Sequence, residues 1–154
     1  MTDPIEDRLR EMGATLPGVA PTGQFLAVHV ANGVAYVSGH APYDAGEFHF
    51  RGKVGREFDL EQGRAAAVAA TLGCLASVKH HLGSLARVGK ELKANGYVNC
   101  TPEFTALPSI MNAASDLLVE LWGEAGRHAR TTVGVASLPM GVAVEVELVL
   151  ELTD

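Results

Sequence analysis

The C-terminal segment, residues 142–152, alternates large aliphatic residues with mostly charged ones. All of its even-numbered positions are valine or leucine, whereas glutamate fills three of its odd-numbered positions. Successive side chains of a β-strand point to opposite faces of a sheet, so this period of two predicts a long strand with one apolar and one polar face. The apolar face belongs to a core that helices must cover. The segment therefore limits the chain to a fold in which helices pack against a sheet.

Two segments of the sequence provide such helices. Asp59 and Gln62 have the spacing of a capping box, and the helix that they start holds no charged residue from 65 to 78 before it ends at Gly83. Because this helix lacks charges over most of its length, we expect neighbouring elements to cover it on more than one side. A second helix is predicted to begin near Pro108 and to end at a later glycine.

The remaining strands follow from alternation and turn signals. Asn32-Gly33 favours a tight hairpin between two alternating segments. Including that hairpin, four strands precede the last one, at residues 26–30, 34–39, 92–100 and 131–137. The first 23 residues are expected to form a short peripheral helix and a loop rich in glycine and proline. Residues 1–154 are thus predicted to form one domain.

The order of these elements favours an α+β fold, with a mixed β-sheet and two long helices packed on one face. At 47% hydrophobic and 19% charged residues, the chain is apolar for a protein of this length. We therefore expect part of its apolar surface to be buried between subunits of an oligomer.

Composition also bounds the partners and the compartment. The net charge of −6 provides no basic field for a phosphate backbone, so we expect no nucleic-acid partner. Neither a signal peptide nor a membrane-spanning apolar run is evident, so no membrane partner is expected. Two cysteines are too few for a disulfide framework and too far apart for a redox or zinc pair, which favours reduced thiols in a cytoplasmic protein.

No metal or nucleotide motif is recognisable in the sequence. His80 and His81 are adjacent, so on a helix they point in different directions and are expected to cap the helix rather than to bind a metal. Cys74 is expected to pack within its apolar helix, whereas Cys100 at a strand end could be accessible, although no base for it is identifiable. We predict no metal site.

The last two strands carry a candidate site. The valines of strand 131–137 are predicted to face the core, which leaves Arg130 and Thr132 on the face of Glu145. A hairpin centred near Pro139 would then place Arg130 a few ångströms from Glu145. One interpretation is a structural ion pair. The other is that Arg130 binds a substrate carboxylate while Glu145 orders or deprotonates a water.

Ser38, Gly39 and His40 at the end of strand 34–39 form a second cluster. It combines a hydroxyl, a glycine that lets backbone N–H groups approach a ligand, and an imidazole. No Ser-His-Asp order or nucleophile elbow accompanies it, so Ser38 is interpreted as a hydrogen-bond donor or a strand terminator rather than a nucleophile.

Four segments in order resemble the RidA/YjgF family, also called the L-PSP endoribonuclease family. The resemblance runs from about Phe25 to Leu152, and its specific part is the spacing of Arg130, Leu138-Pro139 and the Glu-x-Glu at 145–147. The segments that carry it are 34–42, 111–112, 129–139 and 144–147. The segments 97–100, 114–118 and 126–130 look like the divergent branch labelled YjgF-like or chorismate-mutase-like.

This resemblance implies a homotrimer with a chorismate-mutase-like fold and three ligand clefts between subunits. In the family, the arginine that matches Arg130 binds the carboxylate of a 2-imino acid, and the glutamate that matches Glu145 positions the attacking water. The residues that match Ser38, Gly39 and Asn112 line the cleft. No metal and no organic cofactor is implied.

Three positions depart from the family pattern. Family deaminases have a tyrosine at Phe25, a cysteine at Thr132 and commonly a glutamine at His40. Loss of the phenol at Phe25 removes a hydrogen bond to substrate or water, whereas Thr132 supplies the same backbone groups as cysteine. We hypothesise that His40 acts as a proton donor, in which case His40→Gln lowers activity.

The leading functional prediction is an enamine/imine deaminase-like hydrolase that converts a small 2-imino acid to a 2-oxo acid and ammonia. The alternative is a non-catalytic module that binds small carboxylates, such as 2-oxo acids, in the same intersubunit cleft. A third activity, endoribonuclease, follows the family's other label. The acidic charge and the lack of a basic patch interleaved with aromatic residues count against it.

Overall fold

The computed structural model describes residues 2–153. Three α-helices and seven strands are joined by loops and three short 3₁₀ turns. In chain order they are α1 (Pro4–Glu11), β1 (Val28–Ala31), β2 (Val34–His40), β3 (Tyr43–Asp44), β4 (Glu47–Phe48), α2 (Leu60–Leu82), η1 (Leu85–Arg87), β5 (Val88–Asn99), α3 (Leu107–Trp122), η2 (Gly123–Gly126), β6 (Ala129–Val135), η3 (Pro139–Gly141) and β7 (Val144–Leu152). No helix within the described residues is long and apolar enough to cross a membrane.

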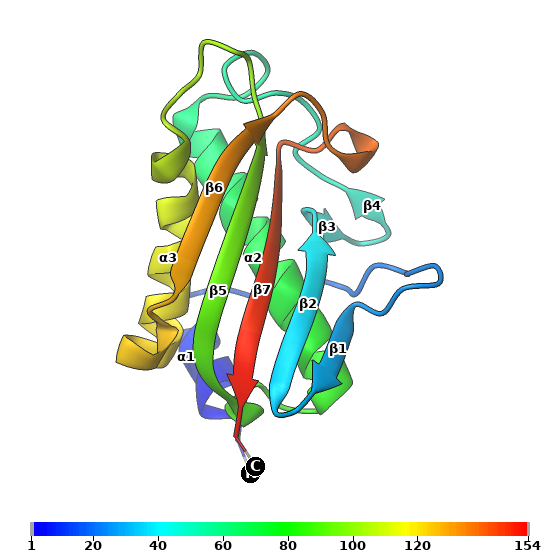
Figure 1. Cartoon of the computed structure of the whole chain (residues 1–154), viewed down its shortest axis with the longest axis vertical. Helices are drawn as coiled ribbons and strands as arrows, with labels where there is room; N and C mark the ends of the chain where they lie inside the picture. Colours follow the sequence, from blue (N-terminus) through cyan, green and yellow to red (C-terminus); the bar gives the residue numbers. More distant parts are fainter. Residues whose placement is uncertain (1, 154) are drawn as a thin grey trace.

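Five strands form the main sheet in the order β1-β2-β7-β5-β6, and β3 pairs with β4 in a small separate hairpin. β5 and β6 are parallel, and the other neighbours in the sheet are antiparallel. Both long helices, α2 and α3, lie behind one face of this sheet, and the other face is open (Figure 1). The predicted α+β fold with a mixed sheet and two helices on one face is therefore confirmed.

The signals that predicted α2 operate as expected. The Asp59 carboxylate accepts the backbone N–H of Gln62 at 2.8 Å, and the Gln62 side chain accepts the backbone N–H of Asp59 at 2.9 Å. Gly83 ends the helix in a left-handed conformation with φ of 85°. Most of the helix is buried from Gly63 onward, because it packs against both α3 and the sheet.

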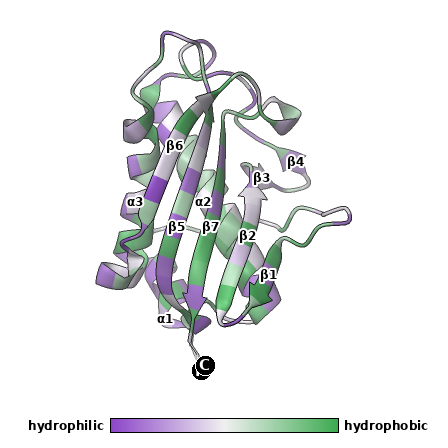
Figure 2. Ribbon diagram, viewed as in Figure 1, coloured by the Kyte–Doolittle hydropathy of each residue, from purple (hydrophilic) through white to green (hydrophobic). Residues whose placement is uncertain are grey.

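The alternation in β7 also has the predicted consequence. Its even-numbered side chains from Val144 to Leu150 are fully buried in the core beneath the helices. Figure 2 shows the matching alternation of hydrophobic and hydrophilic residues along this central strand. Glu145 and Glu147 consequently point to the open face of the sheet.

The predicted hairpin between the last two strands is wrong, because β5 lies between β6 and β7. The helix α3 carries the chain from β5 to β6 as a parallel crossover, and the chain then returns past the end of β5 to form β7. Backbone hydrogen bonds hold this return: Ala143 donates to Phe50, and Asn99 donates to Ala143, each at 2.8 Å.

The predicted facing of β6 is also wrong. Ala94 of β5 lies beside Arg130 on one side and Leu148 on the other, so Arg130 shares the face that the helices cover. Tyr97 similarly joins Val133 to Glu145, so Val133 lies on the open face, where it is 40% exposed. β6 is an edge strand exposed on both faces, so its alternation of valine with other residues did not indicate which side faces the core.

Candidate functional site

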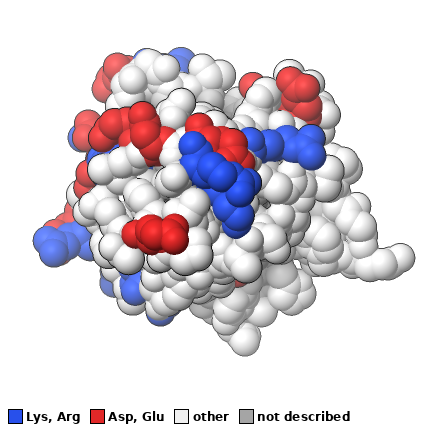
Figure 3. Space-filling view, turned by 90° about the horizontal axis from the view of Figure 1, so that it is seen from above, with Lys and Arg blue, Asp and Glu red and all other residues white. Residues whose placement is uncertain are grey.

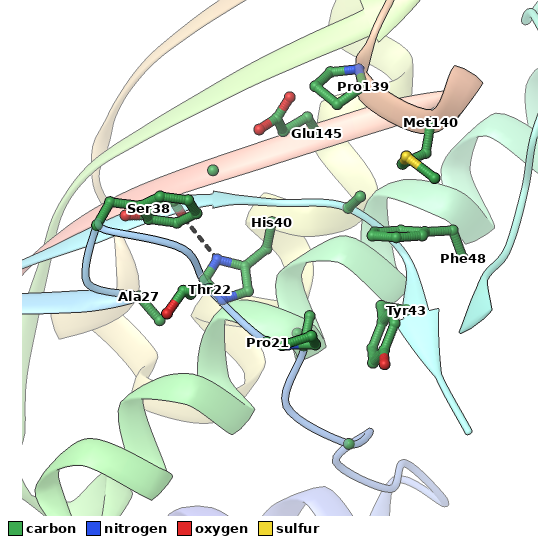
Figure 4. A pocket seen from close by; sticks show the side chains of 16 residues that line it. Pro21, Thr22, Ala27, Ser38, His40, Tyr43, Phe48, Pro139, Met140 and Glu145 are labelled. Carbon is green, nitrogen blue, oxygen red and sulfur yellow. Dashed lines mark hydrogen bonds between the residues drawn. The ribbon is translucent and has the colours of Figure 1, made fainter. Parts of the chain in front are cut away.

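A pocket of about 320 Å³ opens beside the end of β2. Five of the predicted site residues line it, and they come from the loop before β1, from β2 and from β7 (Figure 4). We call this cavity the carboxylate pocket, and the five predicted residues that line it are Phe25, Ser38, Gly39, His40 and Glu145. The fold therefore brings together residues that are far apart in the sequence.

Gly39 makes room for the Glu145 side chain. A Cβ atom added at Gly39 would lie 2.1 Å from Oε1 and 2.9 Å from Cδ of Glu145, which is closer than such atoms can approach. The pairing of β2 with β7 is irregular between Val37 and His40, and this bulge sets Gly39 against the carboxylate. Glycine at position 39 is thus a steric requirement of the carboxylate position.

The electrostatic surroundings of Glu145 favour its protonated form. Burial raises its pKa, and the negative charge of Glu147 raises it further. Glu147 accepts hydrogen bonds from Tyr97 Oη at 2.5 Å and from Asn95 Nδ2 at 2.9 Å. The bond to Glu147 raises the pKa of Tyr97 to about 12, so this phenol stays a donor. Glu145 is therefore a carboxylate with a greater proton affinity than an exposed glutamate.

His40 is held by protein groups through both ring nitrogens. Nδ1 lies 2.6 Å from the Ser38 carbonyl, which can only accept, so Nδ1 carries the proton. Burial lowers the pKa of His40, so the ring is neutral and Nε2 accepts from the Ser77 hydroxyl at 2.7 Å. Ser38 itself donates its hydroxyl to the Leu26 carbonyl at 2.6 Å. These contacts favour a role for His40 in fixing β2 on α2 over the hypothesised role of proton donor.

The other predicted residues form a separate group on β6 and α3. Arg130 Nη1 donates to Asn112 Oδ1 at 2.9 Å and to Ser115 Oγ at 3.1 Å. Ser115 Oγ in turn lies 2.9 Å from His128 Nε2, and the other His128 nitrogen bonds to the Gly126 carbonyl. We call Arg130, Asn112 and Ser115 the arginine cluster. Thr132, two residues along β6 from Arg130 and on the same face of the sheet, has a buried Oγ1 with no hydrogen-bond partner among the described residues.

Arg130 and Glu145 do not meet within one chain. The arginine cluster lies at the β6 edge on the helix side, whereas Glu145 lies on the open face two strands away. Arg130 is not among the residues that line the carboxylate pocket. The expected short distance between the two side chains is therefore wrong for the single subunit, and with it the structural ion pair.

No metal site is evident in the part of the chain that the structure describes, where no three His, Cys, Asp or Glu side chains gather closely enough. Cys74 is fully buried, and burial raises the pKa of its thiol. Cys100 is partly exposed, and its Sγ lies beside Gly134 of β6. It does not line the carboxylate pocket.

The sequence did not indicate the apolar wall of the pocket. Tyr43 and Phe48 of the small hairpin and Met140 of the turn η3 contribute to it. The sequence signal for the hairpin was Gly46: Tyr43 pairs with Phe48 across the two-residue turn Ala45-Gly46, in which both residues have positive φ. No strand was predicted between residues 39 and 59.

Comparisons with known proteins agree with this fold. A model of the family described as "YjgF/chorismate mutase-like, putative endoribonuclease" matches residues 6–152. Protein TCP17 of Trypanosoma cruzi is 38% identical over 152 residues, which cover 97% of this chain and 95% of that protein.

Solved structures give the same result. The protein Atu1372 of Agrobacterium tumefaciens, whose function is described as unknown, is 38% identical with a TM-score of 0.91 over 97% of this chain and 93% of that chain. A Shewanella oneidensis protein named "putative endoribonuclease" is 32% identical with a TM-score of 0.92 over 98% of this chain and 100% of that one. The YjgF gene product of E. coli, at 21% identity and a TM-score of 0.62 over 90% and 95% of the two chains, shares the fold. As its motifs predicted, the chain belongs to the YjgF/chorismate mutase-like family.

Proposed function

We propose that this protein is an imine deaminase-type hydrolase, which adds water to the C=N carbon of a small 2-imino acid. The observation that carries the proposal is the Glu145 carboxylate, which lies against Gly39 in a pocket of amino-acid size and has a raised pKa. A carboxylate of raised proton affinity beside a pocket is suited to act as a general base.

The proposed chemistry is addition of water to the C=N bond followed by loss of ammonia, with Glu145 transferring the protons. Glu145 accepts a proton from a water molecule as the water oxygen bonds to the imine carbon and the C=N π electrons move to nitrogen. Glu145 returns this proton to the nitrogen and then transfers the hydroxyl proton of the tetrahedral intermediate to the nitrogen as well. The oxygen lone pair forms the C=O bond as the C–N bond breaks, so ammonia leaves with both protons of the water and the 2-oxo acid remains. Atoms and electrons balance with water as the only co-reactant.

The carboxylate of the substrate is assigned to Arg130 of a neighbouring subunit. Arg130 is half-buried, and Asn112 and Ser115 orient it through Nη1, which leaves Nη2 to face a ligand. The open face of the sheet supports an assembly, because Tyr36 is 51% exposed and Val133 40% exposed there. We propose the cleft between subunits of a homotrimer that the family resemblance implies.

A binding module in the same cleft is the second candidate. It is favoured by Phe25, which lines the pocket but offers no hydrogen bond to a substrate or water. Endoribonuclease activity has less support, because acidic and basic side chains are mixed on the face seen in Figure 3 and the net charge is −6.

Hydrolysis of 2-imino acids that an amino-acid oxidase generates in situ tests the proposal. We expect acceleration over the spontaneous rate, and a loss of roughly 10²- to 10⁴-fold in Glu145→Gln and Arg130→Ala. Glu151→Gln and Arg127→Ala are matched controls, since both residues are exposed and lie outside the two groups of site residues. Absence of acceleration, with 2-oxo acid binding that depends on Arg130, would support the binding module instead.

Subunit mixing tests where the cleft lies. Arg130→Ala and Glu145→Gln subunits are inactive alone, but a cleft between one subunit of each kind contains both intact residues. In a closed ring assembled at random from a 1:1 mixture, about one quarter of the clefts contain an intact Glu145 from one subunit and an intact Arg130 from its neighbour. About one quarter of the wild-type activity should therefore return. A mixture that stays inactive, although native mass spectrometry detects mixed oligomers, would place both residues in one chain and refute the intersubunit cleft.

A further inference from the structure

We infer that the carboxylate pocket selects 2-imino acids with large apolar side chains, such as those formed from phenylalanine, leucine or methionine, over those formed from alanine or serine. This inference rests on the proposed function and specifies its substrate class. It is carried by the apolar wall formed by Tyr43, Phe48 and Met140.

The small hairpin β3–β4 supplies two of the three side chains of this wall. Tyr43 and Phe48 are directly paired across the hairpin, and their rings contact edge to face with centroids 5.1 Å apart. Such a pair holds each ring in place. Figure 4 shows both rings on the side of the pocket away from Ser38, with His40 between the two sides. The Gly18 backbone N–H donates to Asp44 Oδ1 at 3.0 Å, which ties the loop before β1 to this hairpin.

Met140 adds a flexible part to the wall. Its side chain lies next to Phe48 in Figure 4, although it is 52% exposed in the single chain. The residue has a left-handed backbone with φ of 59°, and its carbonyl accepts a hydrogen bond from Arg51 Nε at 2.8 Å. A thioether adapts to apolar groups of different shapes, so Met140 suits a wall that receives several side chains.

The charges of the pocket agree with an apolar substituent. Among the described residues that line it, Glu145 is the one charged side chain. A 2-imino acid has three groups on its reacting carbon: the nitrogen, the carboxylate and the side chain. When the carboxylate faces the neighbour's Arg130 and Glu145 faces the carbon, the side chain is directed to the wall. An acidic side chain would have no cation to pair with there, and a methyl group would leave the wall unfilled.

The size of the pocket fits one amino-acid skeleton. Its volume of about 320 Å³ lies at the lower end of the roughly 300 to 1,000 Å³ typical of ligand pockets. Filling an apolar wall discriminates between side chains by about tenfold or more. We therefore expect kcat/KM for the phenylalanine-derived imine to exceed that for the alanine-derived imine by at least about tenfold.

The experiment compares these imines, generated by oxidases from the corresponding amino acids, with the wild type and three variants. Met140→Ala and Phe48→Leu should lower the phenylalanine-to-alanine ratio of kcat/KM by about fivefold or more. Met12→Ala is the matched control, because Met12 is also an exposed methionine but does not line the pocket. It should leave the ratio unchanged.

The outcomes separate this inference from the function on which it rests. Acceleration of all imines without preference, or with preference for alanine, overturns the selectivity and leaves the deaminase intact. A ratio that survives both wall variants also overturns it. Absence of acceleration for any imine overturns the proposed function itself, and the substrate class with it.

Discussion

Replacement of Gly39 by alanine tests the geometry of the site most directly. The new methyl group would lie 2.1 Å from Oε1 of Glu145, whereas real contacts of this kind stay beyond 3.0 Å. Either the carboxylate or the bulged strand must therefore move by about 1 Å. Gly39 does not have a positive φ, so alanine adds no backbone strain of its own. The main expected effect of the substitution is therefore a displaced Glu145 carboxylate.

A displacement of this size has a large catalytic consequence. A misplacement of about 1 Å costs on the order of 10²-fold in rate, because the reacting atoms leave their productive geometry. We expect Gly39→Ala to lower kcat/KM for imine hydrolysis by about 10²-fold, while the circular dichroism spectrum and the oligomeric state stay those of the wild type. Gly23→Ala is the matched control, since nothing lies within 4 Å of a Cβ atom at that glycine.

A double variant separates this mechanism from a general loss of folding. In Glu145→Gln the general base is already absent, so displacing the side chain at position 145 has little further effect on catalysis. Gly39→Ala should therefore lower kcat/KM much less in the Glu145→Gln background than in the wild type. Retention of activity by Gly39→Ala within twofold of the wild type would refute the steric reasoning. So would a double variant in which the two losses multiply in full.

The charge of Glu147 raises the pKa of Glu145, so Glu147→Gln should lower that pKa and move the acid limb of the kcat/KM profile to lower pH. An unmoved limb in the measured profile would contradict this coupling. Burial without a hydrogen-bond partner among the described residues raises the pKa of Glu91 from 4.5 to about 8. Because the folded state then binds the proton more tightly, stability falls as pH rises from about 4.5 to about 8, by roughly 5 kcal/mol if the carboxylate stays buried. Roughly 3 kcal/mol of this loss falls between pH 5.5 and pH 9, and urea unfolding at these two pH values should show it in the wild type and not in Glu91→Gln. Tyr36→Lys places a charge on the open sheet face and should shift the oligomer toward smaller species in light scattering, whereas an unchanged mass would exclude that face from the interface.

Local signals in the sequence predicted the elements whose geometry is set locally. Asn32 and Gly33 adopt the positive φ angles of 52° and 75° that a two-residue hairpin turn requires. The capping box at Asp59 and Gln62 forms because both hydrogen bonds lie within one turn. The alternation in β7 is informative because the strand is central, so its two faces differ completely in burial.

The features that were missed depend on distant partners. Nothing in residues 131–141 indicates that β5 will lie between β6 and β7, since that position follows from the crossover through α3. β6 is an edge strand, so its two faces differ little in burial and its sequence does not show which face is buried. Val133 and Arg130 were therefore assigned to the wrong faces. His40 gave no sign of its bond to Ser77, because that contact requires β2 to pack on α2. The family and the fold class were thus predictable from the sequence, whereas the grouping of the candidate site residues into two clusters was not.

The separation of the two clusters constrains the assembly as well as the site. The carboxylate pocket lies beside β2 and the arginine cluster lies at the β6 edge, at opposite sides of the sheet order β1-β2-β7-β5-β6. A cleft that uses both must therefore join the β2 side of one subunit to the β6 edge of another. A two-fold dimer makes such contacts reciprocally, and a head-to-tail assembly makes them from one subunit to the next. Head-to-tail contacts either close into a ring or continue as a filament. Because a closed assembly gives every Glu145 a facing Arg130, the proposed chemistry favours a cyclic oligomer, of which the trimer implied by the family resemblance is one case.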